Sequence, residues 1–189
     1  MNFNNFQRKY TKASIEKSEA GHFVFFWGTS KGHNLDTGCF SQWQSVKFSD
    51  GIREYQNAEQ YMMAQKAILF NDDESLDKIL KENNPKSVKQ LGRKIKNFNE
   101  AIWNENKFRI VLQGNYFKFS NPEFRKVLQN TGDKVIVEAS PSDKIWGIGM
   151  AKTDSRAVSP NQWNGENLLG FALMEVRDIL NKEDSQQAV

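Results

Sequence analysis

The chain contains few of the residues that metal sites and disulfides require. Its 189 residues include one cysteine, Cys39, and two histidines, His22 and His33. A single cysteine excludes an intramolecular disulfide and a multi-cysteine metal site, and two histidines leave little scope for a zinc site built on imidazole. We therefore expect neither a metal nor another cofactor.

Long apolar runs and glycine-rich phosphate motifs are also absent. The longest strongly apolar run near the N-terminus covers residues 22–27, far fewer than the roughly 20 residues that a membrane helix needs. Residues 1–20 are polar and mixed in charge, unlike a signal peptide, so we expect a cytoplasmic protein without membrane contact. The sequence has no G-x-G-x-x-G, Walker or G-x-S-x-G pattern, which weakens the dehydrogenase, kinase and serine-hydrolase interpretations.

The composition is that of a folded domain rich in aromatic residues. Hydrophobic residues make up 38% of the chain and charged residues 26%, a balance typical of globular proteins. Fourteen phenylalanines and five tryptophans indicate a large core or an aromatic-lined pocket. The net charge of +3 does not by itself indicate a nucleic-acid-binding protein.

The organisation of the chain predicts one domain. No internal repeat and no linker rich in Pro, Gly or Ser interrupts it, and the four prolines are scattered. We predict a single domain over residues 21–181, preceded by a polar segment at 1–20 and followed by a flexible tail at 182–189.

Local signals predict a helix-dominated α+β fold with two or three short strands. Aromatic and β-branched runs predict strands at 23–27, 45–48 and 134–139. Asn57 with Gln60 forms a capping-box pattern, and Asn121 before Pro122 marks a second helix start. Apolar spacing and caps together predict helices over residues 57–70, 74–82, 85–98, 99–117, 121–132 and 165–181.

An acid and an amine stand out on the helix predicted at 57–70. Glu59 and Lys66 are seven residues apart, two helical turns, and therefore share a face with Met62 and Met63 nearby. On a partly apolar face the two groups can shift each other's pKa, which gives a proton donor or a nucleophilic amine. The alternative is a surface pair without a chemical role, in which Glu59 is favoured by the helix dipole.

A second candidate follows the strand predicted at 134–139. Asp143 lies three residues before Trp146 in a loop flanked by glycines, and loops at strand ends often display catalytic groups. The alternative is a structural turn in which Asp143 caps a short helix and Trp146 lies in the core.

Four basic residues form a row on the helix predicted at 85–98. Lys86, Lys89, Arg93 and Lys96 lie opposite its apolar stripe. Such a row can follow the phosphates of DNA or RNA. The alternative is an ordinary solvated helix face.

Several segments, taken together and in this order, closely resemble the NADAR family, also called YbiA-like proteins. The segments include FWG at 26–28, FSQW at 40–43, YQNAEQYMMAQKA at 55–67, LGRK at 91–94, LQNTG at 128–132, VEASPSD at 137–143, IWGIG at 145–149 and WNGENLLG at 163–170, and Trp103 and the pair Gly114-Asn115 also match. The resemblance spans residues 22–180, essentially the whole predicted domain. One departure is the stretch 29–38, which is longer than the turn found there in compact bacterial glycosidase members, and it bears on substrate choice rather than on the chemistry.

The resemblance implies an N-glycosidase with a helix-rich α+β fold that binds ribosylated compounds related to NAD or ADP-ribose. Two activities occur in the family. One hydrolyses phosphoribosylamino-pyrimidine intermediates of riboflavin synthesis, and the other removes ADP-ribose from guanine in nucleic acid. Both cleave a bond between ribose C1 and an exocyclic amine of a base, so one mechanism can serve both.

We expect three catalytic residues under this interpretation. Lys66 is the amine nucleophile, which displaces the base through a transient Schiff base, and Glu59 transfers protons. Asp143 holds ribose hydroxyls or orients water. We expect substrate contacts, including a tryptophan stacked on the base, from Trp27, Gly28, Ser41, Asn57, Trp103, Trp146 and Gly147. The alternative mechanism is an oxocarbenium route in which a carboxylate activates water and no covalent intermediate forms.

A different class of function also fits the sequence: a module that binds ADP-ribose or NAD without turnover. The presence of both Glu59 and Lys66 favours the enzyme, since a binding module needs no acid–amine pair. The expected partner is a ribosylated base or ADP-ribosylated nucleic acid, the latter in contact with the basic row from Lys86 to Lys96.

Overall fold

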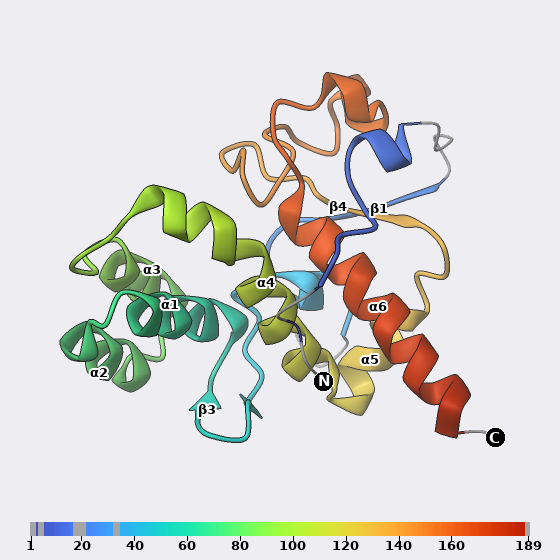
Figure 1. Cartoon of the computed structure of the whole chain (residues 1–189). Coiled ribbons are helices and arrows are strands. Elements are labelled where there is room, and N and C mark those ends of the chain that lie inside the picture. Colours follow the sequence, from blue (N-terminus) through green and yellow to red (C-terminus); the bar gives the residue numbers. More distant parts are fainter. Residues whose placement is uncertain (1–2, 4–5, 17–21, 32–34, 188–189) are drawn as a thin grey trace. The chain divides into compact units, whose positions relative to one another are not determined.

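The computed structural model describes residues 3, 6–16, 22–31 and 35–187, and Figure 1 shows its helices and strands. The chain forms two compact units. The first unit contains Phe3 and residues 42–118, and the second unit contains the other described residues. Among the helices of the described residues, none is both long and apolar enough to cross a bilayer.

The first unit consists of a short hairpin followed by helices. Strands β2 (Phe48–Ser49) and β3 (Glu54–Tyr55) pair antiparallel, with Phe48 opposite Tyr55. The helices are α1 (Ala58–Leu69), α2 (Asp73–Lys81), α3 (Pro85–Gly92) and α4 (Glu100–Phe119). The strand predicted at 45–48 is only partly confirmed. Val46 donates to the Gln56 carbonyl across the hairpin, but only Phe48 belongs to the strand.

The Asn57 cap predicted at the start of α1 is confirmed, and Gln60, the second residue of the capping pattern, makes more contacts than predicted. Asn57 Oδ1 accepts a hydrogen bond from the Gln60 N–H at 2.8 Å. The Gln60 side chain reaches back one residue further than a capping box requires, because its Oε1 accepts from the Gln56 N–H at 2.7 Å. Its Nε2 donates to the carbonyls of Ile79 and Glu82 at the end of α2. One buried amide therefore caps two helices.

The helix predicted at 85–98 is wrong in its second half, since α3 ends at Gly92. In a longer helix the Lys96 N–H would donate to the Gly92 carbonyl, but each of these groups has a partner from another segment. Lys66 Nζ donates to the Gly92 carbonyl, and the Lys96 N–H donates to Asp72 Oδ2. Gly92 is also a poor helix former. The apolar stripe persists beyond the helix, because Ile95 is still buried.

The second unit contains a two-stranded parallel sheet. Strand β1 (Phe23–Phe26) pairs with β4 (Val135–Glu138), with Phe23 opposite Val135. Helix α6 (Leu168–Gln187) packs against β4 and against α5 (Pro122–Gln129). Trp27 lies just beyond β1 rather than inside it. Helices dominate both units and the strands are short, which confirms the predicted fold class.

Described residues near both ends of the chain form structure and contacts that the sequence does not indicate. Helix α6 continues to Gln187, so most of the predicted tail at 182–189 is helical. Arg125 of α5 holds this extension, because its Nη2 bonds to the Leu180 carbonyl and to Asp184 Oδ1 at 2.7 Å. The sequence pattern does not predict a helix here, because residues 181–187 are polar and are stabilised by contacts with α5.

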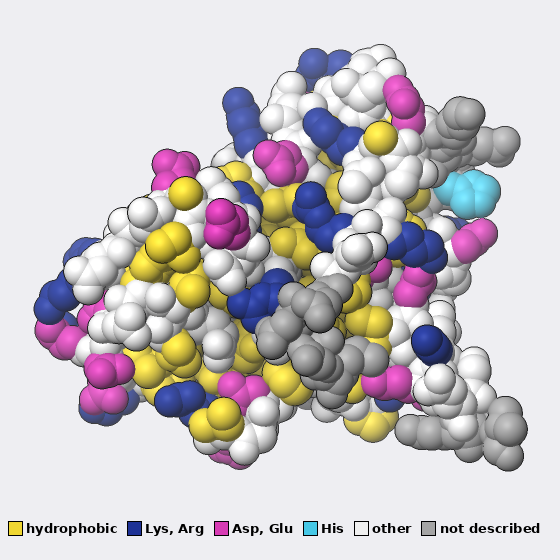
Figure 2. Space-filling view, viewed as in Figure 1, with side chains coloured by type: hydrophobic (Ala, Val, Ile, Leu, Met, Phe, Trp, Pro, Cys, Tyr) yellow, Lys and Arg dark blue, Asp and Glu magenta, His cyan; other side chains and the backbone are white. Residues whose placement is uncertain are grey.

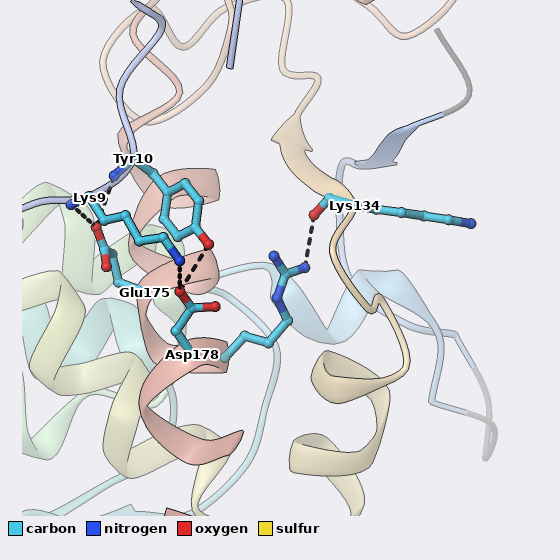
Figure 3. Close-up of polar contacts among 6 residues, drawn as sticks. Lys9, Tyr10, Lys134, Glu175 and Asp178 are labelled. Carbon is cyan, nitrogen blue, oxygen red and sulfur yellow. Dashed lines mark hydrogen bonds and ion pairs between the residues drawn. The ribbon is translucent and has the colours of Figure 1, made fainter. Parts of the chain in front are cut away.

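Lys9 and Tyr10 of the predicted polar segment also lie against α6 (Figure 3). The backbone N–H groups of Lys9 and Tyr10 both donate to Glu175 Oε1. The Lys9 ammonium and the Tyr10 hydroxyl both donate to Asp178 Oδ2. Burial raises the pKa of the Glu175 carboxyl, while the two N–H donors oppose that shift.

Asn167 fastens β4 to the start of α6. The outer edge of a two-stranded sheet has unpaired peptide groups, and the Asn167 amide pairs with two of them on β4. Its Oδ1 accepts from the Glu138 N–H at 3.0 Å, and its Nδ2 donates to the Ile136 carbonyl at 2.9 Å. Its own N–H donates to the Gly147 carbonyl. Asn167 is fully buried and has φ of 54°, a left-handed conformation that asparagine tolerates better than most residues.

We expect Asn167→Ala to destabilise the protein by about 3 kcal/mol, because it leaves buried peptide groups without partners and places alanine at a positive φ. Asn167→Gly loses the same amide but fits the backbone, so it should be about 1 kcal/mol more stable than the alanine variant. Urea unfolding measures both free energies. A loss under about 0.5 kcal/mol in Asn167→Ala would contradict this role.

Candidate active site

Lys66 lies in a partly buried aromatic environment in the first unit. Its Nζ donates a hydrogen bond to the Gly92 carbonyl at 2.9 Å. The same atom lies 4.3 Å from the centre of the Phe98 ring and 5.4 Å from that of Trp103. Burial disfavours the charged form and lowers the pKa of the Lys66 amine. The structure thus brings together Lys66 and Trp103, which the sequence predicts separately.

Glu59 is buried in the first turn of α1, with 3% of its surface exposed. Its Oε2 accepts a hydrogen bond from Trp43 Nε1 at 3.2 Å, and its N–H donates to the Gln42 carbonyl at 3.0 Å. The predicted coupling with Lys66 is not formed. Within the part of the chain that the structure describes, Lys66 makes no ion pair, and its polar contact is the Gly92 carbonyl. The helix therefore holds the acid and the amine independently.

Two aromatic residues near these groups are missing from the predicted site. Trp43 lies in the matched segment FSQW, but the sequence does not indicate its bond to Glu59. Trp43 is 38% exposed, and the centre of its ring lies 6.0 Å from Lys89 Nζ. Phe98 is predicted as part of an apolar helix stripe, yet 46% of it is exposed beside Lys66. Helical spacing does not mark it as a site residue, because its neighbours Lys66 and Phe70 come from a distant part of the chain.

A buried amide pair lies next to Glu59 and is also missing from the predicted site. Asn115 Nδ2 donates to Gln42 Oε1 at 3.0 Å and to the Val111 carbonyl at 2.8 Å. Because the Gln42 carbonyl accepts from the Glu59 N–H, this pair fixes the backbone in front of α1. Asn57 likewise serves the fold, since it is 2% exposed and caps α1. Its contact with substrate stays a prediction.

The second unit holds the other predicted site residues. Asp143 Oδ1 accepts from the N–H groups of Ile145 and Trp146 at 2.9 and 2.8 Å. This is a turn of the kind that the structural alternative predicted, although no helix follows and Trp146 is only half-buried. Gly147 is buried, and a Cβ there would crowd the Glu138 carbonyl. Catalysis by Asp143 and substrate contacts at Trp146 and Gly147 stay predictions.

A cavity of about 460 Å³ opens in the second unit beside the end of β1. Its lining includes the aromatic residues Phe25, Phe26 and Trp27, and Trp27 is 67% exposed. Gly28 follows with φ of 81°, which turns the chain out of the strand. Ser41 is half-buried at the end of a 3-10 helix, and its N–H donates to the Gly38 carbonyl. Trp27 therefore has a binding surface beside it, as a stacking residue needs.

Comparison with known proteins shows the family to which the chain belongs. The family model described as the NADAR domain matches residues 25–181. The chain belongs to the NADAR family. It is 46% identical over 166 residues to an N-glycosidase of Acanthamoeba polyphaga mimivirus, a match that covers 85% of this chain and 97% of that protein. It is 30% identical over 142 residues to an N-glycosidase of Nostoc punctiforme, covering 75% of this chain and 84% of that protein.

The NADAR fold is also seen among solved structures. The NMR structure of the Escherichia coli protein YbiA matches with a TM-score of 0.68 at 24% sequence identity, covering 90% of this chain and 91% of that chain. The resemblance read from the sequence motifs is thereby confirmed for family and fold.

The basic row of this NADAR chain is interrupted. Lys86 and Lys89 lie on α3, Arg93 is the residue after its end, and Lys96 lies beyond the helix. The Lys96 ammonium bonds to Glu74 Oε2 at 2.7 Å, so part of its charge is balanced within the protein. On the face that Figure 2 shows, Lys and Arg side chains are interspersed with Asp and Glu side chains. A nucleic-acid contact here stays a prediction.

We expect the Lys66 amine to titrate below the ordinary lysine value of about 10.4, because burial lowers its pKa. Reductive ¹³C-methylation followed by an NMR titration measures this, and the resonance absent from Lys66→Arg identifies the group. The neutral fraction at pH 7 should exceed that of an ordinary lysine. A Lys66 resonance that titrates at or above about 10.4 would rule out the effect of burial.

Proposed function

We propose that this NADAR chain hydrolyses the bond between ribose C1 and the exocyclic amine of a base. It is an N-glycosidase, as its family and its match with two N-glycosidases over most of its length support. As substrates we propose ADP-ribosylated guanine in nucleic acid or a phosphoribosylamino-pyrimidine intermediate of riboflavin synthesis. The observation that carries the chemistry is the half-buried Lys66 amine between two aromatic rings.

Lys66 has the surroundings that an amine nucleophile needs. Only the neutral amine can attack carbon, and burial lowers the Lys66 pKa, which increases the neutral fraction near pH 7. The Gly92 carbonyl can take an N–H hydrogen bond from either protonation state, so it orients the nitrogen without requiring a charge. The Phe98 and Trp103 rings offer apolar faces on which a planar base can stack.

The proposed reaction passes through an imine on Lys66. Protonation of the ring oxygen opens the ribosylamine to an imine between C1 and the base nitrogen. The neutral Lys66 amine adds to C1, a proton moves to the base nitrogen, and the C1–base bond breaks to release the free amine. Water then adds to the lysine imine, which returns the Lys66 amine and frees the ribose aldehyde. The net consumption is one water.

Glu59 is the proposed proton-transfer group of this sequence. Its carboxylate lies on the same helix as Lys66, and the indole N–H of Trp43 fixes the orientation of Oε2. A carboxyl group can give its proton to the ring oxygen and later accept one from water. The direct alternative, in which Glu59 activates water against an oxocarbenium-like C1, needs no imine on Lys66.

Trapping separates the two routes. If the imine forms, borohydride added during turnover should leave a ribose-derived mass on the peptide that carries Lys66. Lys66→Arg should lose at least about 100-fold in kcat, because a guanidinium stays protonated and cannot form an imine. Normal turnover by Lys66→Arg, with no trapped adduct in the wild type, would eliminate the covalent route.

Replacing Glu59 by Gln should lower kcat by about 10²–10⁴-fold, since the amide cannot transfer a proton but can still accept from Trp43. Circular dichroism and the melting temperature should remain those of the wild type. The matched control is Glu54→Gln, an exposed carboxylate on β3 that should leave kcat unchanged. Near wild-type turnover by Glu59→Gln would remove this residue from the mechanism.

The choice between the two substrates can be tested with Lys89 and Arg93, which form no ion pair with any residue that the structure describes. Lys89→Ala combined with Arg93→Ala should weaken binding of ADP-ribosylated DNA and make its salt dependence shallower by about one unit for each lost phosphate contact. A phosphoribosylamino-pyrimidine should be cleaved as before. Lys78→Ala with Lys81→Ala, two exposed side chains on α2, is the control. An unchanged salt dependence of DNA binding would show that the basic row is an ordinary solvated helix face.

A further inference from the structure

We propose that Phe98 is a positioning residue for the Lys66 amine and that Asp72 holds Phe98 in place. Phe98 belongs to the loop between α3 and α4, and Lys66 Nζ lies over its ring, 4.3 Å from the ring centre. A side chain in this place controls how much water reaches the amine. The inference rests on the proposed function for its role in catalysis, but the contact itself can be tested without turnover.

One short loop places both aromatic neighbours of Lys66. Asn97 has φ of 57°, a left-handed conformation that asparagine tolerates better than most residues, and it turns the chain directly before Phe98. Asn99 then starts α4, because its carbonyl accepts from the Trp103 N–H at 3.0 Å. The ring centre of Trp103 lies 5.4 Å from Lys66 Nζ. A displacement of this loop would therefore change the surroundings of the amine on two sides.

A buried carboxylate fastens the beginning of this loop. Asp72 is 4% exposed, and its Oδ2 accepts from the Lys96 N–H at 2.8 Å. Its Oδ1 caps α2 by accepting from the Ser75 N–H at 3.1 Å. These hydrogen bonds, that from the Lys96 N–H above all, lower the pKa of the Asp72 carboxyl to about 2. The acceptor is therefore charged at neutral pH, and a hydrogen bond to a charged group is stronger than one between neutral groups.

The end of α1 holds Phe98 as well. The Phe98 ring meets the Phe70 ring edge to face, with 5.3 Å between the ring centres, and Phe70 is 5% exposed. The Asp72 N–H donates to the Ala67 carbonyl at 3.0 Å, so the anchor of the loop is joined to the helix that carries Lys66. Phe98 itself is 46% exposed. Its replacement therefore leaves most of the core intact.

Phe98 can act on the amine in two opposite ways. An aromatic face attracts an ammonium, which raises the pKa of a lysine. The same ring keeps water away, which disfavours the charge and lowers the pKa. Burial lowers the pKa of Lys66, so the exclusion of water outweighs the attraction. The nearest charges of the loop balance each other, because the Lys96 ammonium is paired with Glu74 Oε2 at 2.7 Å. Phe98 thus keeps more of the amine neutral.

Replacement of Phe98 separates the two effects. The readout is an NMR titration of the ¹³C-methylated full chain, with the Lys66 signal identified through Lys66→Arg. Phe98→Ala should raise the pKa of Lys66 towards the ordinary value of about 10.4, because water reaches the amine. Phe98→Leu should leave the pKa at or below that of the wild type, since leucine still excludes water. It should also abolish the upfield ring-current shift that the Phe98 ring imposes on the Lys66 methyl signal.

Asp72→Asn tests the anchor of the loop. The amide places an NH₂ group against one of the two N–H donors that the carboxylate accepts from. The loop should loosen, so the pKa of Lys66 should rise as in Phe98→Ala and the ring-current shift should decrease. The matched control is Asp73→Asn, an exposed acid in the first turn of α2. Ile52→Ala is the control for Phe98, because it removes an 80% exposed apolar side chain from the turn between β2 and β3. Neither control should change the Lys66 signal.

A pH profile with ADP-ribosylated DNA distinguishes positioning from a loss of folding. For Phe98→Ala, the rise of kcat/KM with pH should move upward by as many pH units as the NMR pKa, about tenfold in rate at pH 7 for each unit. A merely structural role would lower the rate equally at every pH. The proposal is overturned if Phe98→Ala leaves the pKa of Lys66 unchanged or lowers it, or if Phe98→Leu raises it as much as Phe98→Ala. A wild type without turnover would contradict the proposed function and would leave the NMR result in place.

Discussion

Buried side-chain amides that pair with backbone groups of other elements are the constraint on which this structure depends. Strands of two to four residues cannot satisfy their own edges, and short helices leave many terminal groups without partners. Asn167 completes the outer edge of β4 and holds the loop at Gly147. Gln60 closes the start of α1 and the end of α2. In each unit, an amide with both a donor and an acceptor replaces the peptide group that a longer strand or helix would supply.

Features set by neighbouring residues could be predicted from the sequence. The caps Asn57 and Asn121 and the apolar spacing of the helices are local signals, and they locate α1 and α5 within one or two residues at their starts. The end of α3 could not be predicted, because it depends on Lys66 and Asp72 taking backbone groups of a different segment. The continuation of α6 depends in the same way on Arg125.

The candidate site shows the same division between local and distant information. Helical spacing places Glu59 and Lys66 on one face, but it does not say which partners each will find. The structure gives Glu59 the Trp43 indole and gives Lys66 a carbonyl and two rings, so the two groups have different surroundings. Trp43, Phe98 and the amide pair of Gln42 and Asn115 are the residues that reasoning from the sequence omitted. Their partners come from segments that are distant in the sequence, and helical spacing does not reveal such contacts.

The acceptor of the Lys66 amine is a main-chain atom, and this has a consequence for how the protein can vary. No exchange of one amino acid for another deletes a carbonyl oxygen, so ordinary sequence drift on α3 leaves this contact in place. The carbonyl can be moved only by changing the path of the backbone. Substitution of Gly92 itself is also restricted, because a Cβ there would overlap the Met63 thioether. Repacking between α1 and α3 would therefore alter the hydrogen bond of the amine before any residue that touches it is replaced.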